Sequence, residues 1–183
     1  MKVEGRYVRS FTVRSMRSLI ERKMFTNNGM RFVWNNWVPL KVNFLAWRVT
    51  LDRLPTTMDL RRRIVPVQSV ECKFCHAENE TATHLFISCS FAQQVWEFIA
   101  SWCKVNSLFA LELKDLVVMQ DRCRGSVRWK KAVLSLTQIA LWVMWKNRND
   151  VTFSKKHANM ARIKEEIRTY GFLWVKNRAK CND

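Results

Sequence analysis

Cysteine and histidine residues gather in one short stretch, VECKFCHAENETATHLFISCS, at residues 70–90. Cys72 and Cys75 are separated by two residues, and His84 and Cys89 by four. Two cysteines that flank two residues can chelate one ion through a tight turn, and a tetrahedral Zn²⁺ then needs two more sulfur or imidazole ligands. The spacing therefore predicts one zinc ion held by Cys72, Cys75, His84 and Cys89.

Two alternatives to this ligand set arise from the same stretch. His76 could replace His84, but ligands on adjacent residues point in divergent directions, so Cys75 and His76 would chelate poorly. The thiols could also be buried together without a metal, because free cysteine behaves as a small hydrophobic residue. The regular spacing among polar residues favours the metal site, with His84 as its fourth ligand.

The number of ligands predicts a structural role for the ion. A catalytic zinc site has three protein ligands and keeps one position open for water, whereas four ligands close the coordination shell. A zinc deaminase would need a His-x-Glu motif before its Cys-x2-Cys pair, and the order here is reversed. With only four glycines, the chain also shows no Gly-rich phosphate loop. We therefore expect no catalytic residues.

The ligand spacing also constrains the backbone. In an α-helix, side chains five residues apart point about 140° away from each other. His84 and Cys89 can share an ion only if the helix that begins near Thr81 ends before Cys89. Ser90 and Gln93 form a capping-box pattern that would begin the next helix at this point.

The surrounding elements are expected to be helical. Four glycines and three prolines provide few turn signals, a scarcity that fits long helices better than a sandwich or barrel. We predict a mainly α, compact multi-helix domain with a small Cys3His zinc-binding loop between helices. Apolar spacing and capping patterns predict helices at about residues 12–24, 40–53, 56–63, 90–102, 110–120, 126–149 and 160–174, with 126–149 as the buried centre.

Apolar stripes predict which faces of these helices pack. The stripes are Leu40, Phe44, Trp47 and Leu51 in one helix, with Leu45 and Val49 beside them, Phe91, Val95, Phe98, Ile99 and Trp102 in the next, and Met160, Ile163, Ile167, Tyr170 and Trp174 in the last. We divide the chain into an N-terminal helical lead-in (1–31), a zinc-binding domain (32–105) and a C-terminal helical region that packs on it (106–183). Cys103, Cys123 and Cys181 are too irregularly spaced to predict a second metal site.

The chain is strongly basic, with 32 Lys plus Arg, 15 Asp plus Glu and a formal net charge of +17. Such an excess indicates a polyanionic partner, most often nucleic acid and less often an anionic membrane, although a basic surface can also serve solubility. Residues 1–70 carry +10, residues 71–105 carry −2 and residues 106–183 carry +9. The cysteine stretch therefore lies in the one segment without a basic excess.

Basic residues on both sides of the cysteine stretch are the candidates for phosphate contacts. They are Arg61, Arg62, Arg63, Arg128, Lys130 and Lys131. Within the loop, Glu71, Glu78 and Glu80 outnumber Lys73, so the loop would repel phosphate and would instead join the helices on its two sides. Trp34, Trp37 and Trp47 could stack on bases, but burial in the core is the commoner role of such residues.

No targeting or membrane segment is evident. Residues 1–11 are charged and lack the apolar core of a signal peptide. The most apolar run, Ala132 to Trp145, is too short to span a membrane. We therefore expect a soluble intracellular protein whose cysteines are reduced thiols or metal ligands.

Two longer segments resemble a known family. The residues WVPLKVNFLAWRVTLDRLPTTMDLRRR (37–63) and CKFCHAENETATHLFISCSFAQQVW (72–96) are similar to the zinc-binding domain that follows the reverse transcriptase in plant non-long-terminal-repeat (LINE-type) retroelements. The resemblance covers roughly residues 32–98. The segment LWVMWKNRNDVTF (141–153) resembles the region that commonly trails this domain.

The resemblance implies that Cys72, Cys75, His84 and Cys89 are the zinc ligands and that the chain descends from a retroelement polyprotein. The chain contains neither a Tyr-x-Asp-Asp motif nor clustered carboxylates for two Mg²⁺ ions, so no polymerase activity is expected of it. With the charge, the resemblance predicts a nuclear accessory module, with the cytoplasm as the alternative location. Its partners would be RNA or single-stranded DNA and a reverse transcriptase domain, without a membrane or a small-molecule substrate. The alternative function is a helical scaffold or protein-interaction domain without affinity for nucleic acid.

Overall fold

The computed structural model describes residues 15, 32–106, 108, 110–154 and 156–179. The chain divides into two compact units, residues 1–33 and 34–183. The helix predicted from Thr12 or Ser15 to Met24, like most of the predicted N-terminal lead-in, lies outside the described residues; Ser15 itself is helical.

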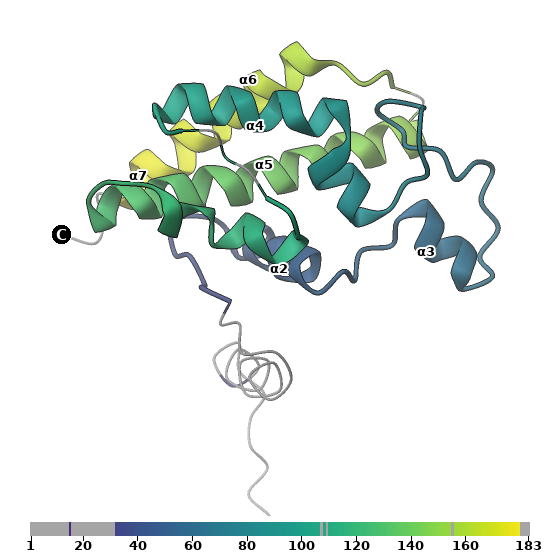
Figure 1. The fold of residues 1–183 in the computed structure, drawn as a ribbon, viewed down its shortest axis with the longest axis horizontal. Helices are drawn as coiled ribbons and strands as arrows, with labels where there is room; N and C mark the ends of the chain where they lie inside the picture. Colours follow the sequence, from purple (N-terminus) through teal and green to yellow (C-terminus); the bar gives the residue numbers. More distant parts are fainter. Residues whose placement is uncertain (1–14, 16–31, 107, 109, 155, 180–183) are drawn as a thin grey trace, which may run out of the picture. The chain divides into compact units, whose positions relative to one another are not determined.

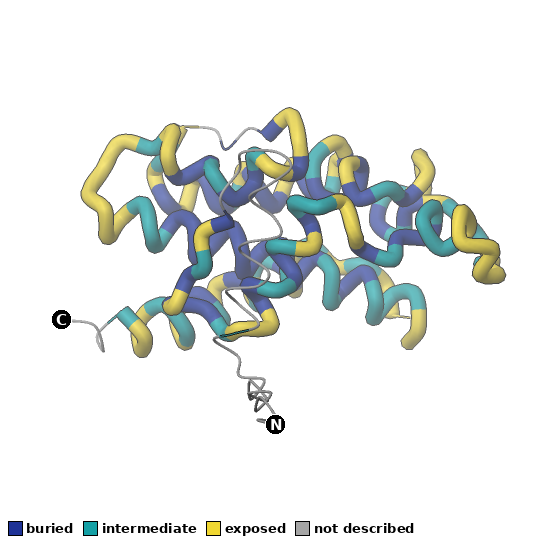
Figure 2. The backbone as a smooth tube through the Cα atoms, turned by 90° about the horizontal axis from the view of Figure 1, so that it is seen from below, coloured by how far each residue is buried: buried dark blue, intermediate teal, exposed yellow. Residues whose placement is uncertain are grey.

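The second unit is mainly helical and is built around one long helix. α5 (Val127–Ser154) packs against α2 (Leu40–Thr50), α4 (Ser90–Cys103) and α6 (Met160–Tyr170), as Figure 1 shows. Every residue from Val133 to Leu141 is buried, because neighbours enclose the helix on all sides. In Figure 2 the buried residues follow the inner sides of the helices, and exposed residues follow the outer sides and loops. The predicted buried central helix is confirmed.

Shorter elements connect these helices. They are α3 (Thr57–Arg62), the π-helical turn η1 (His84–Ser88), the 3₁₀ turns η2 (Leu113–Val117) and η3 (Met119–Arg122), the π-helical segment η4 (Gly171–Lys176) and α7 (Asn177–Ala179). The helix predicted at 110–120 is therefore two 3₁₀ turns. Within the described residues, the β pairing consists of one isolated bridge between Glu71 and Asn79. None of the helices in these ranges is long and apolar enough to cross a membrane.

Two sequence patterns predict capping boxes, Thr56 with Asp59 and Ser90 with Gln93, and they have different outcomes. At α3, Thr56 Oγ1 accepts the Asp59 N–H at 3.3 Å and donates to the Asp59 carboxylate at 2.6 Å. The N-cap forms, but the reciprocal bond of a capping box does not, because the Thr56 N–H donates to the Leu54 carbonyl. At α4 the prediction for Ser90 and Gln93 is wrong, because Cys89 occupies the N-cap position and Ser90 is already the first helical residue. The last helix buries Ile163 and Ile167, which confirms the centre of its predicted stripe.

The packed faces of α2 and α4 agree only in part with the predicted stripes: Leu45, Val49, Val95 and Ile99 are buried as expected, but the large aromatic residues of the stripes are not. α2 buries Val42, Asn43, Leu45, Ala46 and Val49, and α4 buries Ala92, Val95, Trp96, Ile99, Ala100 and Cys103. By contrast, Leu40 is 42% exposed and Trp102 41% exposed. Small and branched side chains fill the close helix contacts, and several of the large aromatic side chains lie at their rims. Asn43 belongs to the buried face because its side chain hydrogen-bonds the backbone N–H and C=O of Asn35, at 2.8 Å each.

Candidate metal centre

A short hairpin positions the first two cysteines. The Cys72 N–H donates to the Glu78 carbonyl at 2.7 Å, and the Glu80 N–H donates to the Val70 carbonyl at 2.8 Å. The His76 N–H then donates to the Cys72 carbonyl at 3.0 Å and closes a turn around Cys75. His76 has a φ of 56°, in the left-handed region that such tight turns require. The hairpin thus brings both sulfurs to one end of the loop, and the exposed His76 lies outside the cluster that they join.

The π-helical turn η1 positions the other two candidate ligands. The Cys89 N–H donates to the carbonyl of His84, five residues earlier, at 2.9 Å. Cys89 itself is extended, with φ −62° and ψ 131°, so the helical turn ends at Ser88. This is the break before Cys89 that the spacing required. The buried Trp96 indole donates to the Phe86 carbonyl at 2.8 Å and ties the turn to α4.

The four ligand atoms of Cys72, Cys75, His84 and Cys89 lie within 4.8 Å of one another. Cys72 Sγ is 3.9 Å from Cys89 Sγ, and Cys75 Sγ is 3.2 Å from His84 Nε2. A tetrahedral Zn²⁺ with Zn–S bonds of about 2.3 Å would hold its sulfurs about 3.8 Å apart. Cys75 is half-buried and the other three residues are buried. Both the donor types and the spacing of their atoms fit zinc.

The sulfurs of Cys72 and Cys89 interact directly. The hydrogen bond to Cys89, together with burial, raises the pKa of Cys72 well above its usual range. The same bond lowers the pKa of Cys89, and backbone N–H groups of Phe91 and Ala92 at the start of α4 act in the same direction. Cys89 therefore favours the thiolate form. Bound Zn²⁺ would supply the positive charge that favours the thiolate of all three cysteines.

A carboxylate orients the candidate histidine ligand. His84 Nδ1 lies 3.0 Å from Glu78 Oε2 and 3.2 Å from Ser88 Oγ. A proton on Nδ1 would be hydrogen-bonded to these oxygens. The lone pair of Nε2 would then be available to a metal ion bound among the three sulfurs. Metal-binding histidines commonly donate their second N–H to a carboxylate in this way. No pattern in the sequence pointed to this role of Glu78.

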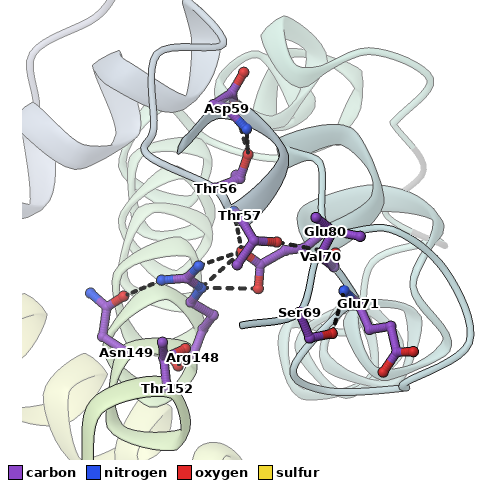
Figure 3. Close-up of polar contacts among 10 residues, drawn as sticks. All are labelled: Thr56, Thr57, Asp59, Ser69, Val70, Glu71, Glu80, Arg148, Asn149 and Thr152. Carbon is purple, nitrogen blue, oxygen red and sulfur yellow. Dashed lines mark hydrogen bonds and ion pairs between the residues drawn. The ribbon is translucent and has the colours of Figure 1, made fainter. Parts of the chain in front are cut away.

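A buried ion pair attaches the hairpin to the rest of the fold. In Figure 3, the Arg148 side chain extends from α5 to the carboxylate of Glu80, and Arg148 Nε lies 3.0 and 2.9 Å from the two carboxylate oxygens. Glu80 is 0% and Arg148 2% exposed. Glu80 also accepts the Thr57 N–H at 2.9 Å, in the first turn of α3. The charge of Glu80, counted above among those that repel phosphate, is therefore neutralised inside the protein.

The predicted phosphate-binding residues form two separate groups. Arg61, Arg62 and Arg63 are exposed at the end of α3. Arg128 is exposed, and Lys130 and Lys131 are half-buried, in the first turns of α5. α3 adjoins Arg148 near the other end of α5, and the 20 residues of helix between Arg128 and Arg148 span about 30 Å. Figure 1 shows α3 and the start of α5 at opposite ends of the unit.

The three tryptophans considered for base stacking differ in exposure. Trp37 is buried, as expected of a core residue, whereas Trp34 and Trp47 are half-buried. The Lys131 ammonium lies 4.9 Å from the centre of the Trp37 ring, so one of the candidate cations stacks on a candidate aromatic residue.

A helical unit with three cysteines and a histidine gathered by a hairpin and a π-helical turn defines the class of zinc-binding modules. Residues 11–96 match the family model described as zinc-binding in reverse transcriptase. The match contains all four clustered residues and confirms the resemblance to a reverse transcriptase zinc-binding domain, although it covers less than half of the chain and ends before α5. Neither the curated proteins nor the solved structures contain a match to this chain.

Proposed function

We propose that this chain is a structural-zinc accessory module of reverse-transcriptase origin that binds RNA or single-stranded DNA and catalyses no reaction of its own. One Zn²⁺ would be held by Cys72, Cys75, His84 and Cys89. The convergence of these four donor atoms within 4.8 Å carries the proposal. Four protein ligands leave no coordination position for a reacting water, which supports a structural role. A reverse transcriptase domain as a second partner and residence in the nucleus belong to the same proposal.

Metal content tests the ligand assignment directly. Native mass spectrometry of the full chain should find one zinc ion, and Cys72→Ala and His84→Ala should each lose it. Cys103→Ala is the matched control, because Cys103 is a buried cysteine outside the cluster. Stoichiometric zinc in both ligand variants would contradict the assignment.

Loss of zinc should loosen one region and leave the others folded. The core around α5 is large, so the unit should not unfold as small zinc fingers do without metal. In hydrogen exchange, Cys72→Ala should lose protection at residues 64–96, while α5 and α6 keep theirs. Equal loss of protection in all helices would mean that the metal holds the whole fold.

Salt titration tests the nucleic-acid proposal. Each phosphate neutralised by Lys or Arg steepens the fall of affinity with salt. Two triple variants, one of Arg61, Arg62 and Arg63 and one of Arg128, Lys130 and Lys131, each with Gln at all three positions, should flatten this slope. The control triple replaces Lys114, Lys156 and Arg168 with Gln. It removes the same charge, but from cations that are already paired with carboxylates. A chain that fails to bind RNA and single-stranded DNA at low salt would refute this part of the proposal.

The separation of the two basic groups favours a second candidate. A helical scaffold or protein-interaction domain would need no continuous basic face, and α3, at whose end the three arginines lie, is far from the start of α5 (Figure 1). The same titration decides between the two functions, because a scaffold without nucleic-acid affinity gives no binding whose salt dependence could change.

A further inference from the structure

A groove at the end of the unit opposite to the zinc cluster combines aromatic and cationic side chains. It has a volume of about 440 Å³ and is lined by Trp37, Arg128, Trp129, Ala132, Val175 and Lys176, among others. The start of α5 contributes Arg128, Trp129 and Ala132, and η4 contributes Val175 and Lys176. Among the described residues that line the groove, none is acidic. Its volume is in the range of small-ligand sites, roughly 300–1,000 Å³.

The two tryptophans of the groove have different roles. Trp129 is 38% exposed and offers ring surface to a ligand. Trp37 is 5% exposed, and its indole Nε1 is a buried donor for which the described residues provide no hydrogen-bond partner. Buried donors are almost always satisfied, so the indole of Trp37, which lines the groove, is a candidate donor to a bound ligand. Carbonyl oxygens of a base or oxygens of a phosphate are suitable acceptors.

The aromatic surface of the groove is held in place before any ligand arrives. The backbone N–H of Trp129 donates to Ser126 Oγ at 3.2 Å and fixes the first turn of α5. Gly125, with φ 147°, packs so closely against the ring that a Cβ there would lie 2.6 Å from Trp129 Cδ1. Lys131 stacks on the ring of Trp37. Little side-chain freedom would be lost on binding, and this favours affinity.

Cations surround the aromatic surface. Arg128 and Lys176 are exposed, and Arg128 Nη2 donates to the Ala179 carbonyl at 3.4 Å, which ties α5 to α7 beside the groove. Stacking of bases on aromatic rings within a positively charged groove is how proteins bind single strands without reading their sequence. A duplex keeps its bases stacked on each other and so offers them no access to Trp129.

We infer that this groove binds one nucleotide of a single-stranded nucleic acid, with the base against Trp129 and the phosphates near Arg128 and Lys176. The inference rests on the proposed function and gives it a site that includes Arg128 but not Arg61, Arg62 or Arg63. It also assigns ligand binding to the start of α5, at the end of the unit opposite to the zinc cluster.

Binding of labelled 12-mers to the full zinc-loaded chain tests the groove. The probes are oligo(U), oligo(dT), an abasic strand with the same phosphates, and a duplex. The wild-type chain should bind both base-bearing single strands about tenfold more tightly than the abasic strand, the effect of one stacked base. Trp129→Ala should remove this preference and leave the affinity for the abasic strand unchanged. Trp37→Phe keeps a ring but removes the Nε1 donor, and should cost several-fold on the base-bearing strands.

The matched control is Trp102→Ala, a tryptophan of similar exposure at 41% that does not line the groove. It should change no affinity. Wild-type binding that Trp129→Ala leaves intact, or reduces equally on base-bearing and abasic strands, would overturn the groove and leave the proposed function standing. A wild-type chain that binds none of the four probes would overturn both.

Discussion

The two ends of α5 differ in how completely their buried polar groups are paired. The zinc end is the part near Arg148, and the groove end is the part near Arg128. At the zinc end, Glu80 and Arg148 neutralise each other in the interior, and Glu78 and Ser88 contact the ring of His84. At the groove end, Arg128 and Lys176 are exposed, and within the described part of the chain Trp37 Nε1 has no hydrogen-bond partner. The buried polar groups named at the zinc end are thus paired within the protein, whereas the groove end has a buried donor for which the described residues provide no partner.

This difference separates a structural role from a binding role. Buried groups that are fully paired contribute to a unique fold but have no donor or acceptor left for a ligand. The zinc cluster, the feature most conspicuous in the sequence, is therefore expected to support the fold. The binding of a partner is then expected at the end that the cysteines do not mark.

The largest effect should follow the loss of one partner of the buried ion pair. Arg148→Ala leaves the Glu80 carboxylate buried without a counter-charge, and we expect a loss of about 3–5 kcal/mol in the free energy of unfolding, measured with urea. Arg168→Ala, at an exposed arginine paired with Glu165, should cost less than about 0.5 kcal/mol. The double variant Glu80→Gln, Arg148→Met should recover much of the loss. A small change in the free energy of unfolding of Arg148→Ala would show that Glu80 does not depend on Arg148 for its pairing in the interior.

A smaller effect is expected from the carboxylate beside His84. Glu78→Gln removes the charge that holds the ring, and zinc affinity measured by chelator competition should fall about 10- to 100-fold. Glu71→Gln is the control, because Glu71 is an exposed glutamate on the same hairpin that does not contact His84. Equal effects of the two variants would indicate that net charge, and not orientation, determines the affinity.

Breaking the ion pair of Glu166 between α5 and α6 should destabilise the protein less than Arg148→Ala and more than Trp129→Ala. Burial opposes ionisation of Glu166, but hydrogen bonds from Lys146 and Arg162 outweigh it and lower the pKa of this carboxyl. The stabilisation is therefore present above the usual glutamate pKa and is lost as the pH falls through the lowered folded-state value. Glu166→Gln should cost about 1 kcal/mol at neutral pH. This difference from wild type should shrink toward zero in urea titrations at acidic pH; a difference that grows on acidification would reverse the sign.

The smallest effect on stability is expected at the groove. Trp129 is partly exposed, and Trp129→Ala should change the free energy of unfolding by about 0.5 kcal/mol or less. Trp96→Ala, in the buried tryptophan that binds the Phe86 carbonyl, should cost about 3–5 kcal/mol. A large loss at Trp129 would mean that the groove end also serves the fold.

The sequence was sufficient for the features that depend on local spacing. The approach of Cys72, Cys75, His84 and Cys89 follows from a short loop and one helical break, and the central helix from its uniformly apolar middle. The pair Glu80–Arg148 was not predictable, because its members are 68 residues apart and no local pattern joins them. The groove was not predictable for the same reason, since Trp37, Trp129 and Lys176 meet only in the folded chain.

The packed faces of α2 and α4 were predicted only in part, for a different reason. The prediction assigned the largest aromatic side chains to the interior of α2 and α4, but these helices also pack through small residues outside the predicted stripes, such as Val42, Ala46, Ala92 and Ala100. Hydrophobicity alone favours an aromatic residue, whereas the distance between two packed helices favours a small one. Phe98 and Trp102 instead stack on each other at the rim, with the Arg168 guanidinium 4.9 Å from the Phe98 ring.

The ion pair of Glu80 with Arg148 limits which segment of the chain can fold when it is expressed alone or moved into another protein. The family match stops at residue 96, so a gene segment cut at that boundary would encode every cysteine and histidine of the cluster but not the arginine. Such a fragment would expose the surface of α4 that normally contacts α5 and would carry an orphaned carboxylate. Recombinant expression of residues 11–96 alone should therefore give insoluble or metal-poor material, and shuffling of this domain among longer proteins would have to carry the downstream helix along.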